Sequence, residues 1–202
     1  TFCTIPLSRG KSRSDTIQNV ISKIKKLKKD GIKEIVLTGI NLGDFKTNEN
    51  DTFLDLLIEI DKIKNIRVRI SSIEPNLINE KIIDLVSQSR TLLPHFHIPL
   101  QSGSDEILKA MKRRYLTTHY KNVVKLIHNR IPHACIGVDV IVGFPGETDE
   151  HFNQTLSFLK ELNISYLHVF SYSKRENTEA INMQNQIPVE TKKYRSKVLR
   201  NL

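Results

Sequence analysis

Residues 135–142 (CIGVDVIV) run directly into residues 143–152 (GFPGETDEHF), and this junction decides the fold. The first segment is rich in Val and Ile, which is typical of a strand. The second begins as a Gly- and Pro-rich turn. It then reaches the start of a helix predicted over 148–162, where Glu147, Asp149 and Glu150 suit the positive N-terminal end. This stretch therefore predicts a strand, a turn and a helix in direct succession.

The same alternation extends along the rest of the chain. Further strands are predicted at 33–38, 66–71, 94–98 and 165–171, and further helices at 52–63, 79–89, 104–112, 117–129 and 189–202. A first helix has an apolar face from Ile17 to Leu27, a cap at Ser14 or Asp15, and Gly31 at its C-terminal end. Strands separated by helices predict an α/β fold with a parallel sheet, either an open doubly wound sheet or a full or partial barrel.

Composition narrows the classes of protein. The chain has 202 residues, 39% of them hydrophobic and 26% charged, which suits a globular protein with a sizeable core. No run approaches the ~18 apolar residues that a membrane span needs. Two cysteines make no disulfide framework, so a cytoplasmic location is expected. The net charge of +9 favours a nucleic-acid partner, although lysines on helix faces are also typical of a solvated surface.

Polar or Gly/Pro-rich segments follow the strands directly, and in either architecture they would meet at the carboxyl ends of the strands. Two carboxylates lie at or near those ends, Glu74 and Asp139. They could act as an acid/base pair, bind ligand hydroxyls and amines, or simply pair with Arg67, Arg69 or Arg175. His95 and His97 share one face of a strand, where a packing role is commoner than a metal site.

A set of motifs, in one order, is similar to a known family. They are TFCTIPLSRG (1–10), LTGINLGD (37–44), SSIEPNLI (71–78), HFHIPLQSGSDEILKAMKRRY (95–115), GVDVIVGFPGETDEHF (137–152) and SYLHVFSYSKRENTEA (165–180). Together they closely resemble the central domain of radical S-adenosylmethionine (SAM) methylthiotransferases. Within that family they are most similar to the members that act on threonylcarbamoyladenosine in tRNA.

The resemblance implies the partial (β/α)6 TIM-like barrel of radical SAM enzymes, with its first strand missing or truncated. It also implies a 4Fe–4S cluster, held by three thiolates that leave one iron free for SAM. Residues 1–3 would be the end of the cluster loop, which has the form C-x3-C-x-aromatic-C. Cys3 would then be the third ligand and Phe2 would lie against the SAM adenine.

The resemblance assigns further residues to SAM. Many family members carry Gly-Gly-Glu where this chain has Gly39-Ile40-Asn41, whose backbone carbonyls could still serve. Polar side chains at Ser72, Glu74, Gln101 and Ser102 would line the SAM cavity. Asp139 would point into the barrel, Ile141 and Gly143 would border the adenine, and Arg175 would face SAM or the substrate.

The implied reaction adds a methylthio group to carbon 2 of threonylcarbamoyladenosine at tRNA position 37. The implied partners are the tRNA anticodon loop, a reductant such as flavodoxin or ferredoxin, and a sulfur donor. Two basic groups, Arg9/Lys11/Arg13 and 112–114, could approach RNA. The first could equally make structural loop contacts, and the second also suits a helix C-terminal end.

Because the chain begins at Thr1, inside the cluster motif, we expect a piece of a longer polypeptide. The core would span 1–188, and the basic helix 189–202 would lead to an RNA-binding domain. With one cluster ligand, this piece is expected to be inactive by itself and to bind neither cofactor. Other interpretations remain open: a radical SAM methylthiotransferase of a ribosomal protein or of isopentenyladenosine tRNA, or a non-catalytic α/β module that binds nucleotide or RNA. The oligomeric state is left undetermined by the sequence.

Overall fold

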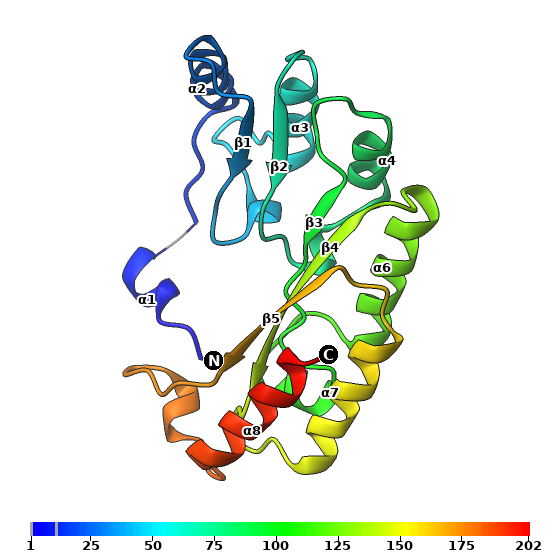
Figure 1. Cartoon of the computed structure of the whole chain (residues 1–202). Coiled ribbons are helices and arrows are strands. Elements are labelled where there is room, and N and C mark those ends of the chain that lie inside the picture. Colours follow the sequence, from blue (N-terminus) through cyan, green and yellow to red (C-terminus); the bar gives the residue numbers. More distant parts are fainter. Residues whose placement is uncertain (1, 11) are drawn as a thin grey trace. The chain divides into compact units, whose positions relative to one another are not determined.

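The computed structural model describes residues 2–10 and 12–202, and it shows a chain of alternating helices and strands (Figure 1). Thr1 and Lys11 lie outside the described residues. The strands are β1 (Glu34–Leu37), β2 (Arg67–Ile70), β3 (His95–His97), β4 (Cys135–Val142) and β5 (Tyr166–Ser171). The α-helices are α1 (Ile5–Arg9), α2 (Ile17–Lys29), α3 (Phe53–Asp61), α4 (Glu80–Gln88), α5 (Asp105–Ala110), α6 (Thr117–Arg130), α7 (Asp149–Glu161) and α8 (Val189–Arg200). Short 3-10 helices are η1 (Leu42–Asp44), η2 (Pro75–Leu77) and η3 (Glu179–Asn182).

The chain forms two compact units. The middle unit contains Lys11–Ile98 and Lys125–Cys135, and the C-terminal unit contains Thr1–Gly10, Pro99–Val124 and Ile136–Leu202. The division follows contacts in space, because both units combine segments that are far apart in the sequence.

Parallel strands form the centre of the middle unit. β1 pairs with β2 from Glu34↔Arg67 to Leu37↔Ile70, and a further parallel bridge joins Ser72 to His97 at the end of β3. Helices α3 and α4 each bury one apolar face, in which Leu57, Ile60 and Ile83 are completely inaccessible to solvent, whereas Ile58 of α3 is 40% exposed. The spacing of these residues matches the helical period, which explains why each helix presents one apolar face.

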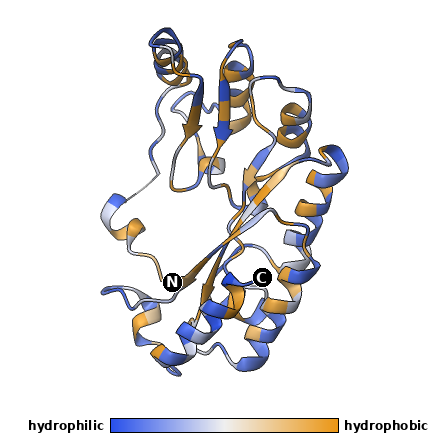
Figure 2. Ribbon diagram, in the orientation of Figure 1, coloured by the Kyte–Doolittle hydropathy of each residue, from blue (hydrophilic) through white to orange (hydrophobic). Residues whose placement is uncertain are grey.

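β4 and β5 form a parallel pair in the C-terminal unit, from Gly137↔Tyr166 to Val142↔Ser171. One face of β4 is fully buried, since Ile136, Val138 and Val140 have no exposed surface. The alternate residues, Asp139 and Ile141, are only partly buried and belong to the opposite face. This alternation follows from the two-residue period of a strand. In Figure 2 the helices carry hydrophobic and hydrophilic residues on different sides, which is the pattern of helices packed against such a core.

Side-chain caps start the helices. Thr52 with Asp55, and Thr148 with His151, form capping boxes at α3 and α7. At α2 the prediction of a Ser14 or Asp15 cap is wrong: the cap is Thr16, whose hydroxyl accepts the Asn19 N–H at 3.2 Å. Asp15 instead accepts the Thr16 N–H and pairs with Lys23. Gly31 follows α2 with φ +88°, as predicted.

All the predicted strands and helices are present, generally one or two residues shorter than predicted. Helix α1 is an addition, because no apolar period announces a five-residue helix. One alternative for the carboxylates is corrected: Arg67 and Arg69 both pair with Glu34, at 3.0 and 2.6 Å, because neighbouring parallel strands place these side chains side by side.

Candidate functional site

The conformation of the turn after β4 is set by two glycines and by a buried carboxylate within the turn. Gly143 and Gly146 have φ of +73° and +83°, a region in which side chains are strained. Between them the backbone curls around the buried carboxylate of Glu147, which accepts the N–H groups of Gly143 and Phe144. Burial raises the pKa of Glu147, while Arg195 and the two backbone N–H groups act in the opposite direction. The turn is therefore organised around a single buried acid.

Helix α8 holds this acid in place. Arg195, itself only 3% exposed, donates from Nη1 to Glu147 Oε1 at 3.1 Å and to the Glu147 carbonyl at 2.9 Å. Its other nitrogen, Nη2, donates to Asp149 at 2.7 Å, and its guanidinium lies over the Phe152 ring. One arginine of the last helix thus connects the turn after β4 to the start of α7.

An apolar cluster adjoins the same turn. Its buried members are Ile107, Met111, Phe144, Tyr172 and Ala180, and Phe2, Ala110, Ile141 and Met183 pack against them. The Phe2 ring meets Phe144 edge-on at 6.2 Å between centroids. The Arg113 guanidinium lies 5.0 Å from the centroid of the Phe2 ring. The segment that carries exposed Cys3 is therefore anchored to this cluster through Phe2.

Two of the basic residues 112–114 have side-chain partners outside helix α5. Helix α5 stops at Ala110, and Lys112 pairs with Glu179 at 2.6 Å. Arg113 lies on Phe2 instead. Their backbone stays at the end of the helix, because the N–H groups of Lys112 (φ +57°) and Arg113 donate to Lys109 O and Leu108 O, each at 2.9 Å. The interpretation of 112–114 as cations for a helix end stays a prediction.

Gln101 is one of the polar residues of this region that have a buried side-chain atom without a hydrogen-bond partner, as Ser104 and Tyr172 also do. Its backbone has φ +70°, and it is held by β4: its N–H donates to Asp139 O at 2.8 Å and its carbonyl accepts the Ile141 N–H at 2.9 Å. The buried side-chain atom Oε1 has no hydrogen-bond partner within the described chain. A buried acceptor without a donor is costly, so this atom suits a ligand that carries an N–H or O–H group.

Ser102, predicted beside Gln101, contacts a helix. Its hydroxyl lies 3.3 Å from Thr155 Oγ1 of α7 and accepts the Ser104 N–H at 3.2 Å. These contacts hold the start of α5 against α7.

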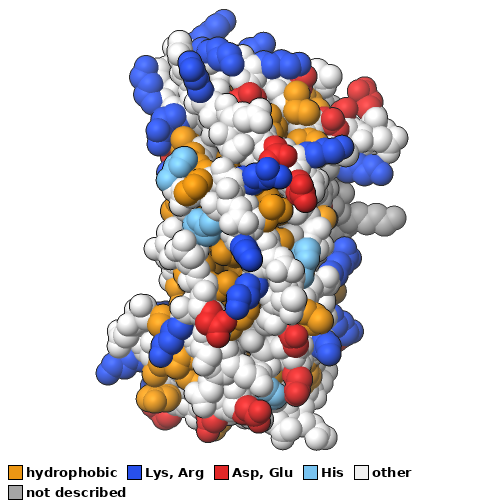
Figure 3. Space-filling model, turned by 90° about the vertical axis from the view of Figure 1, so that its right-hand side faces the viewer, with side chains coloured by type: hydrophobic (Ala, Val, Ile, Leu, Met, Phe, Trp, Pro, Cys, Tyr) orange, Lys and Arg blue, Asp and Glu red, His pale blue; other side chains and the backbone are white. Residues whose placement is uncertain are grey.

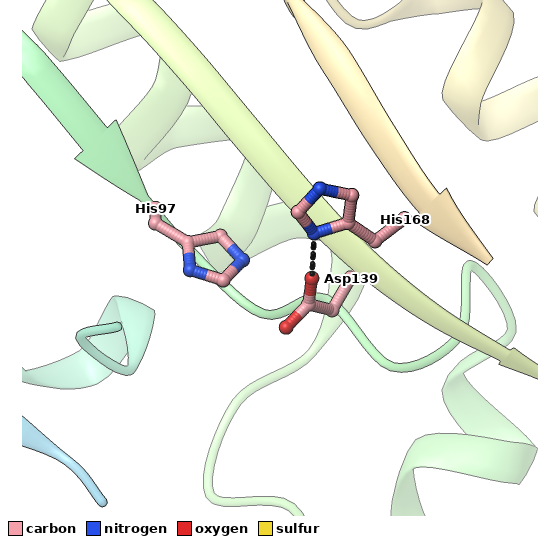
Figure 4. A group of neighbouring side chains, drawn as sticks. All are labelled: His97, Asp139 and His168. Atoms are coloured by element: carbon pink, nitrogen blue, oxygen red, sulfur yellow. Dashed lines mark hydrogen bonds and ion pairs between the residues drawn. The ribbon is translucent and has the colours of Figure 1, made fainter. Parts of the chain in front are cut away.

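Asp139 lies on the partly buried face of β4 and meets a histidine that the sequence analysis did not single out. His168 of β5 is its register partner, and His168 Nδ1 lies 3.1 Å from Asp139 Oδ1 (Figure 4). The third residue drawn, His97, belongs to β3 of the middle unit. The neighbouring register pairs on this face are Gly137 with Tyr166 and Ile141 with Phe170. Arg175 lies in the exposed segment that follows β5, and its carbonyl accepts a hydrogen bond from the Thr178 hydroxyl.

The predicted residues of the middle unit are brought together by the turns after β1 and β2. Asn41 Oδ1 accepts the Glu74 N–H at 3.2 Å, and Asn41 Nδ2 donates to Asp44 at 2.8 Å. Ser72 O accepts the Leu42 N–H at 3.1 Å. Asn41 therefore joins two turns through its side chain. Gly39 lies in the same turn, where an added Cβ would stand 3.0 Å from Leu42 Cδ2.

Three functional candidates escaped the sequence analysis, namely Arg195, His168 and Phe170, and the contact of Arg113 with Phe2 was not predicted either. A signal existed for His168 and Phe170, because aromatic residues at alternate positions of 165–171 share one face of a strand. No local signal marks the arginines, since their partners Phe2 and Glu147 are far away in the sequence.

Among the described residues, no helix is both long and apolar enough to span a membrane.

The parallel α/β fold, the turn after β4 and the segment of Cys3 can now be compared with known proteins. The family model of the radical SAM superfamily matches residues 1–159, and the chain therefore belongs to this superfamily of iron–sulfur enzymes. The predicted radical SAM fold is thereby confirmed. Solved structures agree: coproporphyrinogen III oxidase (HemN) from Escherichia coli superposes with a TM-score of 0.59 at 18% identity, over 71% of this chain and 34% of that chain. A radical SAM methyltransferase from Sphaerobacter thermophilus superposes with a TM-score of 0.59 at 13% identity, over 100% of this chain and 59% of that chain.

Curated relatives are more similar in sequence. Threonylcarbamoyladenosine tRNA methylthiotransferase MtaB is 40% identical in Aquifex aeolicus, over 100% of this chain and 50% of the relative. The protein of the same name from Bacillus subtilis is 42% identical, over 96% of this chain and 44% of the relative. A tRNA-2-methylthio-N(6)-dimethylallyladenosine synthase of Alkaliphilus oremlandii is 41% identical, over 96% and 42%. The chain spans about half the length of the curated relatives it matches.

The cofactors of the superfamily can be tested against the residues present. A 4Fe–4S cluster bound to SAM takes three thiolates. The chain has two cysteines: Cys135 is the first residue of β4, and Cys3 lies in the segment that the sequence analysis assigns to the cluster motif. The residues fit SAM better, because Gln101 Oε1 has no hydrogen-bond partner and could accept a hydrogen bond from an amine or a ribose hydroxyl.

Proposed function

We propose that this chain is the catalytic core of a radical SAM tRNA methylthiotransferase. The observation that carries the proposal is similarity over essentially the whole chain, at about 40% identity, to proteins named as tRNA methylthiotransferases. It is supported by the superfamily match, which includes Cys3 and the turn after β4.

Each residue near the turn has a definite part in this proposal. Cys3 contributes one thiolate to the cluster, and Phe2, clamped between Phe144 and Arg113, keeps that cysteine next to the turn. Gln101 accepts a hydrogen bond from SAM through Oε1. When bound, the cluster and SAM supply one-electron chemistry, and the protein supplies orientation and protection from water.

The proposed substrate is threonylcarbamoyladenosine at position 37 of tRNA, modified at carbon 2. The MtaB relatives support it by their names. A second candidate is the dimethylallyl nucleoside, favoured by relatives of that name at 38–41% identity. These identities are too close to separate the nucleosides. The proposal also retains 1–188 as the core, 189–202 as a connecting helix, and a reductant and a sulfur donor as partners.

The experiment uses the full-length polypeptide that contains these 202 residues. It is reconstituted anaerobically with iron and sulfide and then given SAM, a reductant and tRNA from a strain without methylthio modifications. 5'-Deoxyadenosine and the methylthiolated nucleosides are quantified by mass spectrometry. We expect both products, with the methylthio group on threonylcarbamoyladenosine.

The chain supplies its own matched control. Cys3→Ala should abolish 5'-deoxyadenosine, whereas Cys135→Ala, which removes the other cysteine, should leave it within about twofold. Absence of 5'-deoxyadenosine from the iron-loaded wild-type protein would refute the proposal. Methylthiolation of the dimethylallyl nucleoside alone would establish the second candidate instead.

A further inference from the structure

One face of the β4–β5 pair carries a row of aromatic side chains that are partly or largely exposed. Tyr166, His168 and Phe170 occupy alternate positions of β5, so they lie on one face of the strand. Val169, between them, is buried on the opposite face. Phe170 is 53% exposed and the His168 side chain also 53%. Exposed aromatic side chains gathered on one face are typical of a binding surface.

The three rings form a continuous ladder. The centroids of Tyr166 and His168 lie 5.1 Å apart, and those of His168 and Phe170 lie 6.4 Å apart. Gly137 leaves room for the first ring, because an added Cβ would stand 2.0 Å from Tyr166 Cζ. Rings held at these spacings offer the faces and edges on which a further flat aromatic group can stack.

The middle ring of the ladder is also oriented. His168 Nδ1 meets Asp139 Oδ1 at 3.1 Å, and this carboxylate comes from the adjacent register position of β4 (Figure 4). This contact restricts the orientation of the His168 ring, so the middle of the ladder is positioned by the neighbouring strand.

The ladder ends beside the cysteine segment. Ile141, the register partner of Phe170, packs against the apolar cluster that includes Phe2. Cys3 is the next residue along the chain. At the same end of β5 follow Lys174 and Arg175, both exposed. Aromatic rings followed by cations are the two elements by which proteins hold single-stranded nucleic acid: stacking for the base and charge for the phosphate.

We propose that the β5 ladder, Tyr166–His168–Phe170, is the surface on which a purine base of the RNA substrate stacks, with Lys174 and Arg175 taking the adjoining phosphates. This inference rests on the proposed function, because it supplies the binding surface for that substrate. The same purine chemistry occurs in SAM, so the test separates the two sources. The occupant we assign is the RNA base.

The test measures RNA binding without chemistry. The full-length polypeptide, without reconstituted cluster or added SAM, is titrated into an anticodon stem-loop RNA that carries the fluorescent purine 2-aminopurine at position 37. Stacking on the ladder should quench the fluorescence. Phe170→Leu, which keeps an apolar side chain but removes the ring, should weaken binding about tenfold and abolish the quenching. His168→Ala should act in the same direction.

Two variants guard against a mere loss of folding. Phe170→Tyr keeps the ring and should restore both affinity and quenching. Tyr194→Ala removes a ring that is 66% exposed, more than Phe170, on α8 of the same unit, and should change neither. Circular dichroism melting is recorded for every variant, and Phe170→Leu should melt as the wild-type protein does.

Every outcome decides the proposal. Unchanged RNA affinity and quenching in Phe170→Leu and His168→Ala would overturn it, whatever covers this face instead. Weakened SAM binding by the reconstituted variants, with RNA binding intact, would assign the ladder to the purine of SAM and also overturn it. Failure of the proposed function is a separate result: it is the lack of 5'-deoxyadenosine in the reaction of the reconstituted wild-type protein, whereas the binding test involves no reaction.

Discussion

Gly137 shows how a single residue prepares the β4–β5 face. Its position in the middle of a buried strand would suit Val or Ile better, because Gly weakens a strand. The Tyr166 ring occupies the space where a side chain would start. The glycine thus lets the first ring of the ladder lie flat against its neighbouring strand. At Gln101, similarly, a φ of +70° carries a residue other than glycine into the left-handed region, next to an unsatisfied acceptor.

A substitution at Gly137 tests this packing. Gly137→Val should destabilise the protein by about 1–3 kcal/mol, because the new side chain must displace the Tyr166 ring. Urea unfolding measures the change. Adding Tyr166→Ala should reduce the cost of the valine, since it removes the atoms in the way. Additive effects of the two substitutions would show that Tyr166 does not occupy this space.

His95 gives a prediction for pH. Burial lowers its pKa below the ordinary value of 6.5, and the nearby charges of Arg69 and His97 act in the same direction. As pH falls below 6.5, the unfolded chain takes up a proton at this residue before the folded chain does. The free energy of unfolding should therefore decrease between pH 6.5 and the lowered pKa. Urea unfolding at several pH values should show that His95→Asn flattens this decrease, and an unchanged slope would contradict the assignment.

At the scale of elements, α8 acts as a clamp on the turn after β4. Arg195 neutralises buried Glu147, and the Lys192 side chain fills the space beside Gly143, within 2.1 Å of where a Cβ would stand. Lys192 also donates to the Tyr172 carbonyl at 3.2 Å, just beyond β5. One helix therefore secures the turns that follow both strands of the pair.

Removal of the clamp should be expensive. Arg195→Met should lower the free energy of unfolding by about 3–5 kcal/mol, because it leaves the Glu147 carboxylate buried without a counter-charge. Adding Glu147→Gln should recover part of the loss. Lys193→Met, which breaks an exposed pair with Glu190 on the same helix, should change stability by less than about 1 kcal/mol. Urea unfolding measures both changes. If Arg195→Met and Lys193→Met lowered the free energy of unfolding equally, the role of Arg195 as a clamp would be refuted.

For the whole molecule, charge is the property that bears on function. The chain has 31 Lys and Arg against 22 Asp and Glu. On the face drawn in Figure 3 the basic side chains are distributed among acidic ones. A general positive charge attracts any nucleic acid, whereas cations placed beside the ladder would hold particular phosphates. The two effects differ in their response to salt.

That difference can be measured with variants of equal charge change. The double variant Lys174→Ala/Arg175→Ala should reduce the slope of log Kd against log [KCl] by about 1.4, for two lost contacts to single-stranded phosphates. Lys193→Ala/Lys197→Ala removes two exposed cations of α8 and should leave the slope nearly unchanged. Binding of the anticodon stem-loop between about 50 and 200 mM KCl provides the data. Equal slopes for both variants would mean that only the net charge acts.

The sequence by itself determined the order of strands and helices, the turns that follow the strands, and the superfamily. These features depend on local patterns: the two-residue period of strands, the helical period, and Gly or Pro at turns. The predicted neighbours Asn41, Ser72 and Glu74 also lie together, because the ends of adjacent parallel strands meet at one edge. The cofactor roles of the predicted residues stay predictions.

Only the tertiary structure decided which side chains meet across long stretches of chain. Glu147 finds Arg195 48 residues away, and Asp139 finds His168 29 residues away. The physical reason is that such pairs follow from strand register and from the need to neutralise a buried charge, and neither leaves a periodic mark in the sequence. The aromatic residues of β5 were visible as letters, but their exposure depends on which face of the strand the helices cover.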